Sequence, residues 1–209
     1  MSRSKLNYGV YNGKNFKKIF ENSRTILLGI MFSLGVMFGA SAINSGNIIT
    51  EKISEFADSY IIIKSEQGIP EIFLNSIISN MIFLILNVFL SFSLIGYPML
   101  FFIPLLKGLG TGIVCGYMYS VYGFSGFGYC ALTIIPGTIV STYALITACN
   151  NSCEYSKNAF LKSILGKGQF EKGETKIFLT RQIIFAGICI ISSLTDAVFS
   201  YVFLRFFEF

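Results

Sequence analysis

The chain has 209 residues, of which 53% are apolar and 13% are charged, about half the charged share of a typical soluble domain. Its mean hydropathy is +0.66. These values exclude a disordered chain and an ordinary soluble domain, and they predict an all-α integral membrane helical bundle. The chain has no histidine, which excludes hydrolases with a histidine base and zinc sites with histidine ligands.

Five stretches are apolar and long enough to cross a bilayer, which takes about 20 residues as a helix. They are predicted at residues 26–44, 77–95, 99–122, 127–149 and 183–206. Together they form one transmembrane bundle over residues 26–206. Ala40-Ser41-Ala42 resembles a signal-peptidase site, but the segment before its apolar run is longer than in an ordinary signal peptide, so we expect the first span to be retained.

The second and third spans are joined by Gly96-Tyr97-Pro98. Glycine after a helix end and proline at the next helix start is the favoured order. Gly96 and Pro98 therefore predict a tight hairpin turn with no domain between the two spans.

Basic residues predict the orientation of the bundle. Residues 1–25 and the loop 150–182 hold 12 of the 16 lysines and arginines, whereas the loop 45–76 is acidic. Cytoplasmic loops carry the excess of basic residues, so we expect the N-terminus inside, the acidic loop outside and a multi-pass protein of a bacterial cell membrane.

Short amphipathic helices are expected at the membrane surface. In residues 1–25, Phe16, Ile19 and Phe20 share one face among lysines, which favours an interfacial helix on anionic lipid; a solvated basic tail is the alternative. In the acidic loop a second amphipathic helix either rests on the membrane or docks an extracytoplasmic partner. Its candidate partner face consists of Glu51, Glu55, Phe56, Asp58 and Tyr60.

Two charged residues lie inside predicted spans, Lys107 in the third and Asp196 in the fifth. Charges at such depth usually face the bundle interior and pair. We predict a Lys107–Asp196 contact that holds the two helices in register, with a proton or ion relay as the functional alternative. Pro104 and Pro136 predict kinks in the third and fourth spans.

Small residues predict close helix packing. They are spaced at four in the first and third spans, and such spacing lets helix backbones approach. The residues are Gly35, Gly39, Gly108, Gly112 and Gly116. The pattern does not separate packing within one chain from a homo-oligomer.

Polar stripes run along three spans, at Ser76, Asn80, Asn87 and Ser91, at Thr138, Ser141 and Thr142, and at Ser192, Asp196 and Ser200. They predict hydrogen bonds between helices, and a solute path would use the same residues. The five cysteines, including Cys149 and Cys153, are expected to be buried apolar residues. We expect no catalytic site, cofactor, metal or nucleic-acid partner.

Several short blocks give the chain a family likeness. They are Gly35-Val36-Met37-Phe38-Gly39-Ala40, Ser93-Leu94-Ile95-Gly96-Tyr97-Pro98, Leu106-Lys107-Gly108, Ile134-Ile135-Pro136 and Asp196-Ala197. The chain resembles the stage II sporulation protein M family of endospore-forming bacteria over nearly its whole length. Many broader relatives have a histidine and a glutamate in the fourth span, where this chain has Pro136-Gly137-Thr138-Ile139-Val140.

The resemblance implies a function in engulfment, when the mother-cell membrane migrates around the forespore. Family members are membrane anchors, not enzymes. Their partners are two peptidoglycan-degrading enzymes, the lytic transglycosylase stage II sporulation protein D and the amidase or endopeptidase stage II sporulation protein P. The alternative is a transporter or permease subunit that uses the region of Lys107 and Asp196.

Overall fold

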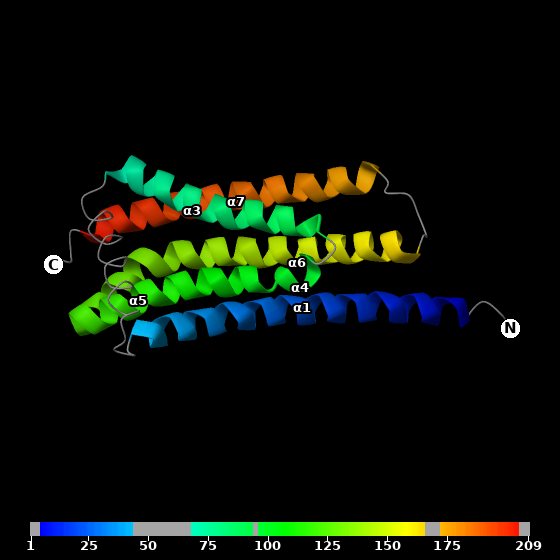
Figure 1. The fold of residues 1–209 in the computed structure, drawn as a ribbon, viewed down its shortest axis with the longest axis horizontal. Coiled ribbons are helices and arrows are strands. Elements are labelled where there is room, and N and C mark those ends of the chain that lie inside the picture. The colour runs from blue at the N-terminus through cyan, green and yellow to red at the C-terminus, as the bar shows by residue number, and fades with distance from the viewer. Residues whose placement is uncertain (1–4, 44–67, 94–95, 166–171, 205–209) are drawn as a thin grey trace.

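The computed structural model describes residues 5–43, 68–93, 96–165 and 172–204, and this part of the chain is helical, with no strand. The long helices lie side by side in an elongated bundle (Figure 1). The elements are α1 (Lys5–Ile43), α3 (Ile69–Ser91), α4 (Gly96–Met99), α5 (Phe102–Tyr129), a π-helical turn η1 (Cys130–Ile134), α6 (Ile135–Leu165) and α7 (Lys172–Leu204). The predicted all-α membrane bundle is confirmed.

Within these residues four stretches are long and apolar enough to cross a membrane, namely Ser23–Ile43, Ile69–Ser91, Gly96–Leu161 and Gly173–Phe203. The third stretch is interrupted at Gly123, whose φ of 57° and ψ of −131° are not helical. Positive φ favours glycine because it has no Cβ. The chain reverses there, and α5 and α6 lie side by side (Figure 1). The five predicted spans therefore correspond to α1, α3, α5, α6 and α7.

The helices extend beyond the predicted spans. α3 begins at Ile69, where a proline in its first turn and Glu71 favour a helix start. α6 continues to Leu165 and α7 begins at Lys172. The helix predicted within residues 1–25 is continuous with the first span in α1, because no proline interrupts propagation into the apolar run. Its position on the membrane surface stays a prediction. The candidate partner face of the acidic loop lies outside the described residues.

In Figure 1, α3 and α7 lie along one side of the bundle, α1 lies along the opposite side, and α6 and α5 lie between them. α1 and α5 form the most extensive helix pair, α7 packs on α3 and α6, and α3 makes few contacts with α5. α1 and α7 begin at the same end of the bundle, which we call the basic end because the lysine-rich segments join there (Figure 1). That this end faces the cytoplasm stays a prediction.

Glycines bring α1 and α5 into backbone contact. A Cβ atom at Gly35 or Gly39 of α1 would overlap the carbonyl oxygen of Leu105 or Leu109. Three glycines of α5 meet the α1 backbone in the same way, Gly108 at Phe32, Gly112 at Val36 and Gly116 at Ala40. The contacts advance together along both helices, so α1 and α5 run parallel. The predicted close packing is therefore formed within one chain.

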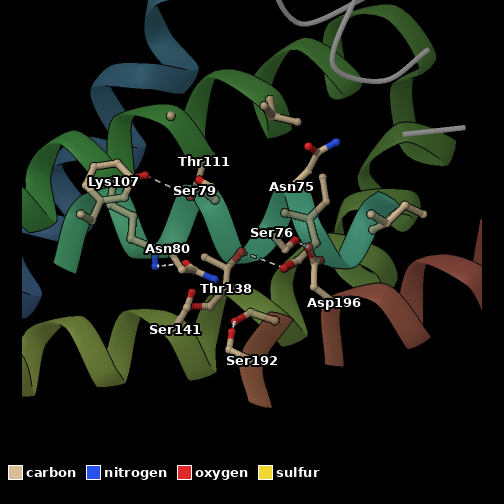
Figure 2. Close-up of a pocket in the computed structure, with 16 residues that line it drawn as sticks. Asn75, Ser76, Ser79, Asn80, Lys107, Thr111, Thr138, Ser141, Ser192 and Asp196 are labelled. Atoms are coloured by element: carbon tan, nitrogen blue, oxygen red, sulfur yellow. Dashed lines mark hydrogen bonds between the residues drawn. The ribbon is translucent and has the colours of Figure 1, made fainter. Parts of the chain in front are cut away.

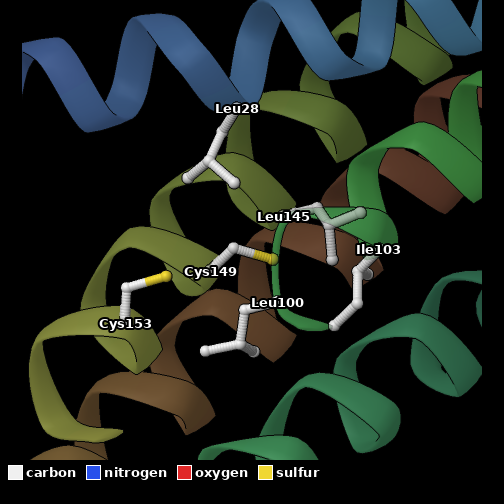
Figure 3. Close-up of a cluster of buried hydrophobic side chains, with 6 residues drawn as sticks. All are labelled: Leu28, Leu100, Ile103, Leu145, Cys149 and Cys153. Atoms are coloured by element: carbon white, nitrogen blue, oxygen red, sulfur yellow. The ribbon is translucent and has the colours of Figure 1, made fainter. Parts of the chain in front are cut away.

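A core of fully buried side chains lies toward the basic end, where α1, the hairpin and α6 meet (Figure 3). It consists of Leu28, Leu100, Ile103, Leu145, Cys149 and Cys153. The two thiols fill space as small apolar groups. Four of the five cysteines are buried and none forms a disulfide.

The hairpin before α5 is built from Gly96, Pro98 and Pro104. Gly96 is buried, and a Cβ atom there would overlap the Leu90 carbonyl oxygen. Pro104 lies in the first turn of α5, a position that tolerates proline. The predicted kink at Pro104 is therefore found one turn earlier, as the break at Leu100 and Phe101 between α4 and α5.

Candidate functional site

A polar cavity of about 410 Å³ lies between α3, α5, α6 and α7, where α3 and α5 make few contacts. Figure 2 shows polar side chains from all four helices around it. Both charged residues singled out from the sequence, Lys107 and Asp196, line this cavity. Charges inside membrane spans usually face such a cavity or pair within the bundle, so we take it as the candidate functional site.

Lys107 comes from the first turns of α5 and only 9% of it is exposed. Its Nζ donates a hydrogen bond of 2.9 Å to Asn80 Oδ1 of α3 (Figure 2). The amide of Asn80 in turn donates through Nδ2 to Ser193 Oγ of α7 at 3.2 Å. Asn80 therefore connects the buried ammonium to a neighbouring helix.

Asp196 comes from α7 and accepts a hydrogen bond from Ser76 Oγ of α3 (Figure 2). Ser76 and Asn80 are one helical turn apart on α3. Each of the two charges thus has a hydrogen-bond partner on the same face of α3. The structure brings Lys107 and Asp196 to one cavity by way of α3, while a direct contact between them stays a prediction.

Pro136 and the residues around it shape the wall of the cavity that η1 and α6 form. Proline has no N–H and disturbs the preceding helical turn, and here that turn is the π-helical η1. Thr133 and Thr138 donate from Oγ1 to the carbonyls of Tyr129 and Ile134 at 2.7 and 2.8 Å. The predicted irregularity at Pro136 is therefore this π-helical turn.

Gly137 allows α7 to approach α6 closely beside the cavity. A Cβ atom at Gly137 would lie 2.8 Å from the Cβ of Asp196, and Ser192 Oγ donates to the Gly137 carbonyl at 2.7 Å. Only glycine allows α7 to approach this far, which positions the Asp196 carboxylate at the cavity.

A second polar network lies nearer the basic end. Asn87 Nδ2 of α3 donates to Gln182 Oε1 of α7 at 3.4 Å, and Gln182 Nε2 donates to Ser152 Oγ of α6 at 3.1 Å. All three residues are buried. Gln182 and Ser152 fall in the predicted loop 150–182, so the sequence analysis does not identify them as buried residues. Gln182 is seven residues before Cys189 and shares its helical face. This spacing is the pattern that could have predicted a buried helical position for Gln182.

The described residues contain no group of three or more histidine, cysteine, aspartate or glutamate side chains that could hold a metal ion. The cavity's chemistry is therefore that of one cation, one carboxylate, hydroxyls and amides. Such groups bind a solute by charge and hydrogen bonds, and they also join helices.

The fold and the cavity define a multi-pass, all-α membrane protein with a polar site inside its bundle. The family described as stage II sporulation protein M matches residues 14–206, and the chain belongs to that family. The resemblance stated from the sequence is confirmed, and the chain is a sporulation-related membrane protein. The comparisons with curated proteins and with solved structures give no match.

Proposed function

We propose that the protein is a non-catalytic membrane scaffold that anchors and localises peptidoglycan-degrading enzymes during endospore engulfment. The observation that carries this proposal is the family match over residues 14–206, which spans the whole described bundle except the first turns of α1. The partners are stage II sporulation proteins D and P, and the site of action is the mother-cell membrane at the septum.

The arrangement of the bundle supports a scaffold. α1 and α5 are in backbone contact at several glycines, and α3 and α7 are joined by side-chain hydrogen bonds at both ends of their contact. A bundle held in this way keeps the helix ends from which its connecting segments start in fixed positions. The acidic segment 45–67 joins the end opposite the basic end, where cell-wall enzymes would meet it.

The test is co-purification from sporulating cells with a tag on the N-terminal segment. We expect both hydrolases to be recovered with the wild-type chain. A Glu51→Lys, Glu55→Lys double variant should reduce recovery, whereas Glu174→Lys at the basic end should leave recovery unchanged. If neither hydrolase is recovered from membranes that contain normal amounts of the protein, the scaffold function is refuted.

A permease subunit is the second candidate, and the cavity of about 410 Å³ with Lys107 and Asp196 favours it. Transporters place polar groups and interrupted helices near the membrane midplane. The distinguishing experiment is labelling of Ser141→Cys, a buried residue of the cavity lining, by a membrane-impermeant thiol reagent added from either side of the membrane. Reaction from both sides indicates alternating access and supports a permease; protection from both sides contradicts it.

A further inference from the structure

The cavity presents two opposite charges at separate places along one helix. Lys107 is held through Asn80 and Asp196 through Ser76, and these two α3 residues differ by one turn, about 6 Å at 1.5 Å per residue. A ligand that engages both charges therefore carries an anionic and a cationic group separated by a short spacer. The spacing is too large for the adjacent ammonium and carboxylate of an α-amino acid.

The ammonium of Lys107 has hydrogen-bonding capacity left for an anion. An ammonium group has three donors, and among the described residues its hydrogen bond goes to the neutral amide of Asn80. Lys107 is more than nine-tenths buried. A buried cation is costly in a membrane unless it is paired, and the hydrogen bond of Lys107 goes to an uncharged amide, so an anionic group of a ligand would be strongly favoured beside it. A phosphate is such a group, and lysine binds it as a point charge.

The rim of the cavity is accessible from the side of the bundle. Asn75, Ser79 and Gly110 line the cavity and are exposed, and space is open around Gly110, where a Cβ atom would meet nothing within 4 Å. Ser79 lies at the middle of α3, at the depth of the lipid hydrocarbon. The opening between α3 and α5 thus faces lipid.

The lining combines polar groups with apolar ones. Ile72, Phe83, Val114 and Ile134 line the cavity beside the charges. Exposed polar side chains at hydrocarbon depth are unfavourable unless a polar group covers them. A phospholipid satisfies both parts of this lining, since its headgroup would lie inside and its glycerol and acyl chains would remain outside between α3 and α5.

We propose that this cavity binds a phosphoethanolamine group, with the phosphate at Lys107 and the primary ammonium at Asp196 and Ser76. The ethyl spacer separates the two charges, and the ammonium has the N–H donors that a carboxylate and a hydroxyl accept. The trimethylammonium of choline has none. The group is supplied by a phosphatidylethanolamine lipid from the bilayer or by free phosphoethanolamine. This inference goes beyond the scaffold function and does not depend on it.

The test is native mass spectrometry of the full chain purified from nanodiscs that contain equal amounts of phosphatidylethanolamine, phosphatidylcholine and phosphatidylglycerol. We expect one phosphatidylethanolamine to be retained about tenfold more than either other lipid, as expected from one or two charge-assisted hydrogen bonds. Equal retention of the three lipids overturns the proposal unless free phosphoethanolamine binds. If free phosphoethanolamine binds but the lipid is not retained, the site is supported and its ligand comes from solution. If neither the lipid nor free phosphoethanolamine binds, the site is refuted.

A rim variant tests the same site without altering its charges. Gly110→Leu adds a side chain at the opening, where space is free, and should abolish retention while leaving the unfolding temperature unchanged. Gly187→Leu on α7 is the matched control, since a Cβ atom there also meets nothing within 4 Å and the residue does not line the cavity. Asp196→Asn should reduce preference for ethanolamine over choline, and Thr195→Val should not. Retention that persists in Gly110→Leu and Asp196→Asn contradicts the proposal.

Discussion

Lys107 Nζ lies 2.9 Å from Asn80 Oδ1, so the buried cation of α5 is held by an uncharged side chain of α3. The amide that accepts this bond also donates to Ser193 of α7. One asparagine therefore connects three helices at the cavity. Because α3 and α5 make few other contacts, this hydrogen bond is a main direct link between these two helices.

Asn80→Leu should lower the stability of the bundle. It leaves the Lys107 ammonium without its acceptor, and a buried group that loses its partner costs about 1–3 kcal/mol. Asn80→Asp should restore or raise stability, because a carboxylate at the same position would pair with the ammonium. The measurement is thermal unfolding in detergent. Equal midpoints for Asn80→Leu and the wild type would show that the bond contributes nothing.

Exchange of the two charges tests the predicted pairing of Lys107 and Asp196. The single variants Lys107→Asp and Asp196→Lys each place two like charges in one cavity and should sharply reduce folded protein in the membrane. The double exchange should restore a substantial part, since Asn80 and Ser76 can each donate or accept a hydrogen bond. Folded yield by size-exclusion chromatography is the readout. A double variant no better than the worse single one argues against interaction between the charges.

Gly112→Ala should separate α1 from α5. Its methyl group would overlap the Val36 carbonyl, and overpacking of this kind typically costs about 1–3 kcal/mol. Gly29→Ala is the matched control on α1, because nothing lies within 4 Å of its Cβ position, and it should leave stability equal or slightly higher. Thermal unfolding of both variants checks the pair. A Gly112→Ala variant as stable as Gly29→Ala would contradict the packing.

The Asn87–Gln182 pair should show coupling in a double-mutant cycle. Gln182→Leu alone leaves the buried amide of Asn87 without its hydrogen-bond acceptor, at a cost of about 1–3 kcal/mol. Asn87→Leu together with Gln182→Leu removes both partners and should cost less than the sum of the single changes. Additive changes in the free energy of unfolding would show that the two side chains act independently.

Sequence patterns predicted the bundle well because hydropathy and length determine which segments can span lipid. The glycine spacing located the α1–α5 contact correctly because GxxxG requires only the local helical period. Helix ends were less predictable. α7 begins at Lys172, inside the predicted loop 150–182, since polar sequence alone does not end a helix that continues beyond the apolar region.

The cavity was predicted only in part. Lys107, Asp196, Ser76 and Asn80 stood out as polar residues in apolar spans. That Lys107 bonds to Asn80, and that Asp196 bonds to Ser76, depends on how α3 is placed between α5 and α7, which no pattern within a single helix specifies. The π-helical turn before Pro136 likewise results from local backbone accommodation, whereas the sequence indicated only a kink.

The parallel pairing of α1 with α5 also affects how the chain is assembled during synthesis. α1 leaves the ribosome first, but its backbone-contact partner follows only after α3 and the hairpin have been made. In that interval the Gly35 and Gly39 face of α1 has no α5 to pack on and must lie against lipid or an insertion factor. A nascent chain stopped after Ser91 therefore holds α1 without its main partner, and final assembly of the bundle begins only when α5 enters the bilayer.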